Sequence, residues 1–162
     1  MPDLLIKLYE LQFEQYPKEH FDCDFKIVRP LSGDKSKVIE FVRKEFSESW
    51  ANECERSFSN APVSCFIGVK EQKIIGFACY DATAKGFFGP IGIKPEARKK
   101  GIGTQLLFSC LSDMWDNEYG YAVVGWVGED QIDFYKKNTF ATVIPGSNPG
   151  IYKKMVEITA MG

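Results

Sequence analysis

The strongest constraint on the fold is a strand–helix–strand unit in the middle of the chain. From Gly103 onward an apolar stripe predicts a long amphipathic helix. The stripe consists of Leu106, Leu107, Cys110, Leu111, Met114 and Trp115. A predicted strand, residues 86–93, precedes the helix, and residues 121–127 form an apolar run short enough to be a buried strand. Because a crossover helix connects parallel neighbours, the unit predicts a parallel strand pair.

The other predicted elements place this pair in a mostly antiparallel sheet flanked by helices, a mixed α/β fold. Further strands are predicted at residues 25–31, 64–69, 74–80, 140–144 and 151–158. Further helices are predicted after Asp34 and after Ser47 from their apolar spacing, and a short helix is predicted at residues 130–138. Leucines at helical spacing predict a short helix over residues 4–11, within an N-terminal helical extension, residues 1–24. No repeat or linker divides the chain, so we expect one domain over residues 1–162.

Composition excludes several classes of function. With 162 residues and 44% hydrophobic residues, the chain can build the core of one ordinary domain. A net charge of -2 gives no attraction to polyanions, so no nucleic-acid partner is expected. No stretch has the ~18 apolar residues that a membrane span needs, and the N-terminus lacks the pattern of a signal peptide. We therefore expect no membrane partner and a cytoplasmic location.

Cysteine and histidine usage limits the chemistry further. The five cysteines are Cys23, Cys54, Cys65, Cys79 and Cys110. No two have the C-x-x-C spacing of a metal or redox site, so reduced, mostly buried thiols and no metal are expected. His20 is the single histidine, which argues against most zinc hydrolases and Ser-His-Asp enzymes. Catalysis would then use carboxylates, tyrosine, thiols or backbone groups.

The loop between the central strand and the long helix has the composition of a phosphate site. Its core, residues 98–103, reads R-x-x-G-x-G. Unpaired N–H groups at a helix N-terminus point toward an anion, and Gly101 and Gly103 allow the backbone to approach it. A Walker loop would need Gly-Lys-Ser/Thr, and a dinucleotide fingerprint would need glycine where Leu106 stands. The alternative is that residues 98–101 form only a solvated turn.

This arrangement resembles the pyrophosphate-binding segment of the GNAT superfamily of acetyl-CoA-dependent N-acetyltransferases, which reads Q/R-x-x-G-x-G/A. The element order is similar over nearly the whole chain. A second motif, residues 134–140, resembles the family's F-Y-x-K-x-G-F, in which the tyrosine commonly acts as general acid. Thr139 stands where the family has glycine, so the turn after that helix must be built differently.

The resemblance implies acetyl-CoA as co-substrate and names the residues that would bind it. In the family the parallel strands splay, and the pantetheine arm fills the opening like an added strand. The implied cofactor-binding residues are Ile91, Gly92, Ile93, Arg98, Lys99, Lys100, Gly101, Ile102, Gly103 and Thr104. Tyr135 is the implied catalytic acid. Because no cysteine has a basic partner in sequence, direct attack by the amine in a ternary complex is favoured over an acyl-cysteine intermediate.

The acceptor is less constrained. Trp50, Trp126 and Tyr152 are candidates for an aromatic acceptor-binding surface, with core packing as the alternative for the two tryptophans. Some family members carry a glutamate on the fourth strand, but residues 87–90 offer no carboxylate. Candidate bases are therefore Glu48, Glu53, Asp81 and Asp133, with solvated charges as the alternative.

The resemblance leaves three functions open. A small-molecule amine is the favoured acceptor, and a similarity to a bacterial subgroup that includes amino-sugar acetyltransferases adds amino sugars as one class. The alternatives are protein or peptide N-acetylation and a non-catalytic acyl-CoA-binding regulatory domain. A second copy of the chain is a further expected partner, because homodimers are common in the family.

Overall fold

The computed structural model describes residues 1–22 and 24–160, and Cys23 lies outside them. The strands are β1 Leu4–Lys7, β2 His20–Phe21, β3 Lys26–Val28, β4 Cys65–Lys70, β5 Lys73–Tyr80, β6 Phe87–Ile93, β7 Tyr121–Val124 and β8 Thr142–Val143. The helices are α1 Lys35–Glu45, α2 Glu48–Ser57, α3 Ile102–Asp116 and α4 Glu129–Thr139, with 3₁₀ turns at Leu8–Glu10, Ser32–Asp34, Pro95–Ala97 and Gly150–Lys154. None of the described helices is long and apolar enough to cross a membrane.

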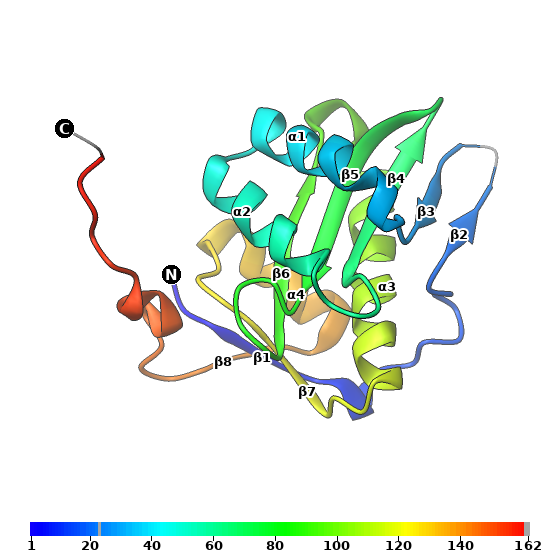
Figure 1. Ribbon diagram of the computed structural model, residues 1–162. Helices are drawn as coiled ribbons and strands as arrows, with labels where there is room; N and C mark the ends of the chain where they lie inside the picture. The colour runs from blue at the N-terminus through cyan, green and yellow to red at the C-terminus, as the bar shows by residue number, and fades with distance from the viewer. Residues whose placement is uncertain (23, 161–162) are drawn as a thin grey trace.

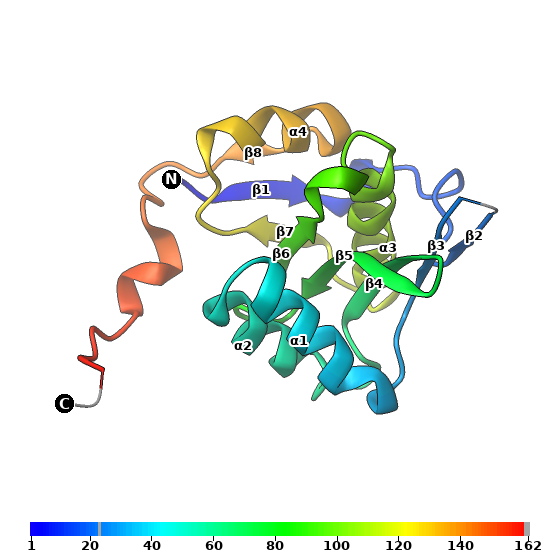
Figure 2. The ribbon, with the colours of Figure 1, turned by 90° about the horizontal axis from the view of Figure 1, so that it is seen from above.

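The strands form one sheet between two helical layers (Figures 1 and 2). The strand order is β2-β3-β4-β5-β6-β7-β1-β8. α1 and α2 cover one face, and α3 and α4 cover the other (Figure 2). Each face has its own apolar cluster, and neighbouring residues of β4 show the alternation: Phe66 packs in the α3 cluster, whereas Ile67 packs in the α1–α2 cluster.

The central prediction is confirmed, because β6, α3 and β7 form the strand–helix–strand unit. β6 pairs with β7 in parallel, and all other neighbouring strands pair antiparallel. The β4–β5 hairpin and the two consecutive helices lie where the sequence predicts them. Ser47 caps α2 as expected, since its Oγ accepts a hydrogen bond from the Trp50 N–H at 3.1 Å.

The predicted N-terminal helix is wrong: residues 4–7 form strand β1. Leu4 and Ile6 are fully buried, which is the two-residue alternation of a strand. β1 pairs antiparallel with both β7 and β8. An eight-residue helix is marginal by itself, so pairing with two strands overrides the leucine spacing.

The predicted C-terminal strands are largely wrong. Residues 140–144 contribute only the two-residue strand β8, and residues 151–158 contain no strand. Gly150, at φ 64°, begins a 3₁₀ helix, and the chain then runs away from the sheet (Figure 1). A strand is stable only when a neighbour pairs with it, and residues 155–160 have no such neighbour in the described chain.

A buried ionic network joins the end of β5, the residue after β3 and helix α3. The Asp113 carboxylate, 2% exposed, accepts from Arg29 at 2.9 and 3.0 Å and from the Tyr80 hydroxyl at 2.6 Å. Lys18 Nζ lies 3.1 Å from the same carboxylate. Burial by itself raises the pKa of Asp113, but hydrogen bonds from Arg29 and Tyr80 outweigh it, and the pKa lies below its ordinary value.

The predicted burial of the cysteines is confirmed for four of the five. Cys54, Cys65, Cys79 and Cys110 are free and buried. The sulfur atoms of the first three lie within 4.8 Å of one another in the α1–α2 cluster, although the residues are scattered in sequence. They act there as small apolar side chains of the core.

Candidate active site

The sheet opens between β6 and β7. The parallel pairing covers only Phe87 with Val123 and Phe88 with Val124. Beyond it, β6 continues to Ile93 alongside β5, whereas the chain after Val124 turns away. Trp126 marks that turn, with φ 52° and its N–H bonded to Asp3 Oδ1 at 2.9 Å. The predicted splayed strand pair is therefore present, and β7 ends three residues earlier than predicted.

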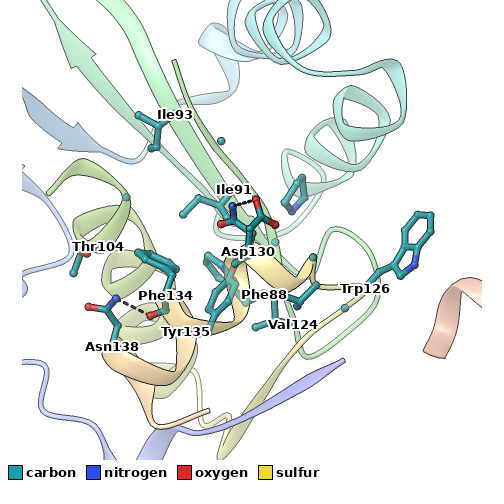
Figure 3. Close-up of a pocket in the computed structure, with 18 of the residues that line it drawn as sticks. Phe88, Ile91, Ile93, Thr104, Val124, Trp126, Asp130, Phe134, Tyr135 and Asn138 are labelled. Atoms are coloured by element: carbon teal, nitrogen blue, oxygen red, sulfur yellow. Dashed lines mark hydrogen bonds between the residues drawn. The ribbon is translucent and has the colours of Figure 1, made fainter. Parts of the chain in front are cut away.

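A pocket of about 1000 Å³ occupies this opening. Figure 3 shows Ile91 and Ile93 of β6 facing Phe134 and Tyr135 of α4 across it, with Trp126 at the far end. One long cavity thus connects the start of α3 with the loop after β7.

The start of α3 lines one end of the pocket with unpaired backbone donors. Gly101 is the N-cap, in a left-handed conformation with φ 82° that favours glycine. The first intrahelical bond runs from the Gln105 N–H to the Gly101 carbonyl. In the chain as described, the N–H groups of residues 99–104 have no protein acceptor. With the positive end of the helix dipole behind them, these groups form an anion site.

The structure places most of the predicted cofactor-binding residues on this pocket. The lining includes Ile91, Gly92, Ile93, Arg98, Lys99, Gly101, Gly103 and Thr104. Two are displaced: Lys100 is exposed outside the lining, and the Ile102 side chain is 2% exposed in the core. Ile102 can therefore contribute only its backbone N–H. The Arg98 side chain bonds back to the Ile93 carbonyl through Nε at 3.1 Å, which holds the loop against β6.

Gly92 permits a close approach of an aromatic side chain to the backbone of β6. A Cβ atom at this position would lie 2.5 Å from the Phe46 ring, which packs directly on the β6 backbone. Phe46, the C-cap residue of α1, also lines the pocket. No spacing in the sequence indicates this contact, because it depends on how α1 crosses β6.

Tyr135 is buried against the pocket. Its side chain is 4% exposed and packs edge-on against Phe88 and Phe134, at ring distances of 6.2 and 5.2 Å. Burial raises the pKa of the Tyr135 hydroxyl well above its usual value. No hydrogen-bond partner of this hydroxyl is found among residues 1–22 and 24–160. In that part of the chain, every fully buried side-chain N or O atom has a hydrogen-bond partner. The Tyr135 hydroxyl is therefore not fully buried, and it contacts the pocket that Tyr135 lines.

The turn after α4 is built without glycine, as the motif required. Phe140 takes the left-handed C-cap position, with φ 57°, and its N–H bonds to the Lys136 carbonyl. Thr139 directs its hydroxyl to the Tyr135 carbonyl at 2.6 Å. Although Thr139 replaces the glycine of the motif, α4 still extends to Thr139 and includes Tyr135.

The other end of the pocket is aromatic and holds a carboxylate. Trp50, Trp126 and Tyr152 all line it, and the Trp126 and Tyr152 rings lie 5.1 Å apart. The Tyr152 hydroxyl donates to Glu53 Oε1 at 3.1 Å and lies 3.5 Å from Thr83 Oγ1. All three predicted acceptor residues therefore line the pocket, although they are far apart in sequence. Trp50 also packs on Phe77 in the α1–α2 cluster, at a ring distance of 6.1 Å, which is the alternative core role.

The four candidate bases separate. Glu53 and Asp133 line the pocket. Glu48 lies outside the lining and accepts from Arg43 at 2.8 Å. Asp81, also outside it, accepts from the Tyr119 hydroxyl and the Gly86 N–H.

Solved structures share this fold at low sequence identity. A glucosamine N-acetyltransferase region of a fungal multi-domain β-N-acetylglucosaminidase matches with TM-score 0.68 and 12% identity, over 88% of this chain and 19% of that one. A GCN5-related N-acetyltransferase from Sphaerobacter thermophilus matches with TM-score 0.66 and 18% identity, over 88% and 48%. The PaiA N-acetyltransferase of Thermoplasma acidophilum, solved with coenzyme A, matches with TM-score 0.51 and 22% identity, over 70% and 87%. The chain thus spans less than half the length of the first two.

The family assignment rests on the sequence as well as on the fold. No curated protein gives a significant match. The model of the acetyltransferase (GNAT) family matches residues 5–140, which include the loop at the start of α3 and all of α4. The chain belongs to the acetyltransferase (GNAT) family.

Proposed function

We propose that this protein transfers the acetyl group of acetyl-CoA to the primary amine of a small molecule, by direct attack in a ternary complex. One observation carries the proposal: a single pocket joins the unpaired N–H groups of residues 99–104 to the aromatic end that holds Glu53. A donor and an acceptor can therefore meet at the splayed strands. Such juxtaposition replaces a bimolecular encounter by a step between bound groups.

The residues present fit acetyl-CoA. Backbone N–H groups of residues 99–104 would hold the pyrophosphate, whereas the Arg98 N–H is already bonded to the Pro95 carbonyl. The exposed Lys99 and Lys100 would add positive charge nearby. The unpaired edge of β6 at residues 91–93 would run beside the pantetheine arm. The co-substrate supplies an activated thioester, and the protein supplies position and proton transfer.

Tyr135 is the proposed acid for the departing thiolate. A departing thiolate whose thiol has a cysteine-like pKa of about 8.5 can take a proton from a tyrosine of pKa about 10 when the two are within hydrogen-bond reach. Since burial raises the pKa of Tyr135 further, the hydroxyl stays protonated at neutral pH. With no protein acceptor in the described chain, that proton is available to a ligand in the pocket.

A small acceptor is favoured by the contact that crosses the aromatic end. Tyr152 reaches from the 3₁₀ helix Gly150–Lys154 to Glu53 on α2, and this link lies where an extended peptide would need an open groove. The aromatic rings suit a sugar face or an apolar amine, so amino sugars are the first class to test.

The test is acetyl-CoA consumption with a panel of amines: amino sugars, polyamines, amino acids and peptides. Free thiol release that depends on a small amine supports the proposal. Release with peptides alone would support protein N-acetylation instead. Binding of acetyl-CoA would be monitored by fluorescence quenching of the pocket tryptophans. If acetyl-CoA binds but no acceptor causes thiol release, the hypothesis of a non-catalytic acyl-CoA-binding domain is favoured.

A further inference from the structure

Glu53 differs from the other acidic residues at either end of α2. Glu48 is paired with Arg43 at 2.8 Å, and Glu55 is paired with Lys35 at 3.4 Å, both on exposed surface. Glu53 is half-buried and lines the pocket, and no ion pair to it is found among the residues that the structure describes. Its charge is therefore available to a ligand.

The Glu53 carboxylate is held in place by one donor. The Tyr152 hydroxyl donates to Oε1 at 3.1 Å, and the Tyr152 ring is fixed against Trp126 at 5.1 Å. A carboxylate offers about four acceptor positions, so one hydrogen bond orients the group and leaves the rest for a bound donor.

The pocket carries charges of both signs, and α4 contributes Asp130, Asp133 and Lys137 to its lining. Arg98 and Lys99 stand at the end formed by the start of α3, whereas Glu53 stands among aromatic side chains at the other end. Aromatic faces and an unpaired carboxylate together attract an ammonium group, through the ring quadrupole and through charge. The chemistry that fits this end is a protonated primary amine.

We propose that Glu53 binds the protonated amine of a cationic acceptor and then takes its proton, with Tyr152 as a positioning residue. The binding step stands by itself, and the proton transfer rests on the proposed function. An amine of pKa about 10.4 is neutral in only about one molecule in 2,500 at pH 7, so a bound amine must lose a proton before it can attack the thioester.

The step balances without any further reactant. One N–H bond of the ammonium group breaks, and its proton passes to a Glu53 oxygen. The freed nitrogen lone pair forms the N–C bond to the acetyl carbon, and the C–S bond breaks with its electron pair going to sulfur. A proton from Tyr135 then converts the thiolate to the thiol. The acylated nitrogen still carries a second excess proton, which passes to the Tyr135 phenolate, and Glu53 releases its own proton to solvent.

Binding tests the first half without turnover. With coenzyme A bound, calorimetry would compare glucosamine with glucose and 1,4-diaminobutane with 1,4-butanediol. We expect the wild type to bind the amine of at least one pair about tenfold more tightly than its partner, and Glu53→Gln to remove that preference. Glu55→Gln, on the same helix but outside the pocket, should retain it. Equal affinities in both pairs, or an unchanged preference in Glu53→Gln, would overturn the proposal.

Kinetics test the second half with the best amine of the acceptor panel. Glu53→Gln should lower kcat/KM at pH 7 by about 100-fold or more, and the deficit should shrink as pH rises and the neutral amine becomes abundant. A merely structural role would lower the rate equally at all pH values, which would contradict base catalysis.

The other charged or titratable side chains that line this pocket are Arg98, Lys99, Asp130, Asp133, Tyr135, Lys137 and Tyr152.

The two failures are distinguishable. If the wild type acetylates no amine, yet binds the amine through Glu53, the proposed function fails and the binding assignment stands. If acetylation proceeds at the wild-type rate in Glu53→Gln across the pH range, the base assignment fails and the proposed function stands. Equal thermal midpoints for Glu53→Gln and Glu55→Gln would show that folding is not the cause.

Discussion

Tyr80 and Tyr135 are equally buried, at 4% exposure each, but they lie in opposite kinds of surroundings. Tyr80 donates to Asp113 at 2.6 Å, within the buried ionic network. Among the described residues, every fully buried side-chain N or O atom has a hydrogen-bond partner. The Tyr135 hydroxyl faces the pocket with no protein partner among the described residues. Burial raises the pKa of both phenols. Burial therefore does not distinguish the two tyrosines. What distinguishes them is whether the hydroxyl has a hydrogen-bond partner in the protein: a partner indicates a stabilising role, and an unpaired hydroxyl at a pocket indicates a chemical one.

The largest expected effect is a loss of activity in Tyr135→Phe. Removing the proposed acid should lower kcat by about 10²- to 10⁴-fold. No hydrogen bond to protein is lost, so the thermal midpoint should stay near that of the wild type. Thiol release and thermal melting measure the two effects.

Tyr80→Phe is the matched control and should show the reverse. Losing its bond to a buried carboxylate should cost about 1.5–3 kcal/mol of stability, with kcat little changed. If the two variants lose stability and activity in the same proportion, the distinction between the two tyrosines does not hold.

The next effect is on stability, in Asp113→Asn. The change leaves the partly buried Arg29 guanidinium without its counter-charge, and breaking one partner of a buried pair costs about 3–5 kcal/mol. Denaturant unfolding measures the loss. Acetyl-CoA affinity of the folded variant should be unchanged, because Asp113 is outside the pocket lining. A large change in affinity would contradict the separation of the two regions.

The two glycines of the loop should differ. Gly101→Ala puts a side chain at φ 82°, which should cost about 1–2 kcal/mol and raise the KM for acetyl-CoA. Gly103→Ala would place its Cβ 3.8 Å from Ile93 and 3.9 Å from Phe134, which are ordinary contacts, so stability should hold or rise by about 0.5–1 kcal/mol. Thermal melts of both variants test this, and equal losses would show that the αL cap is not the constraint.

The smallest expected effect is on acid stability. The folded-state pKa of Asp113 is depressed, so its contribution is present above the unfolded value of about 3.9 and is lost as pH falls through the lower folded value. The stability difference between the wild type and Asp113→Asn should therefore shrink below about pH 4. Unfolding curves at pH 3 and pH 7 check this, and a constant difference would assign the network a role other than charge pairing.

Predictions from the sequence were most accurate where local periodicity and tertiary contacts agree. The apolar stripe of α3 and the R-x-x-G-x-G loop before it depend on residues close in sequence, and both lie where predicted. The termini failed because strand formation depends on a partner: β1 has two, whereas residues 155–160 have none in the described chain. Leucine spacing at the N-terminus contains no information about that pairing.

By itself, the sequence determined the family, the parallel strand pair and the phosphate-type loop, because these follow from short-range spacing and glycine placement. Only the tertiary structure decided which of the two candidate α2 carboxylates lines the pocket. Glu48 and Glu53 were equivalent candidates in the sequence, but the orientation of α2 directs Glu53 into the pocket and leaves Glu48 with Arg43. The contact that holds Glu53 comes from Tyr152, 99 residues away, because long-range packing, which no local pattern encodes, brings the two side chains together.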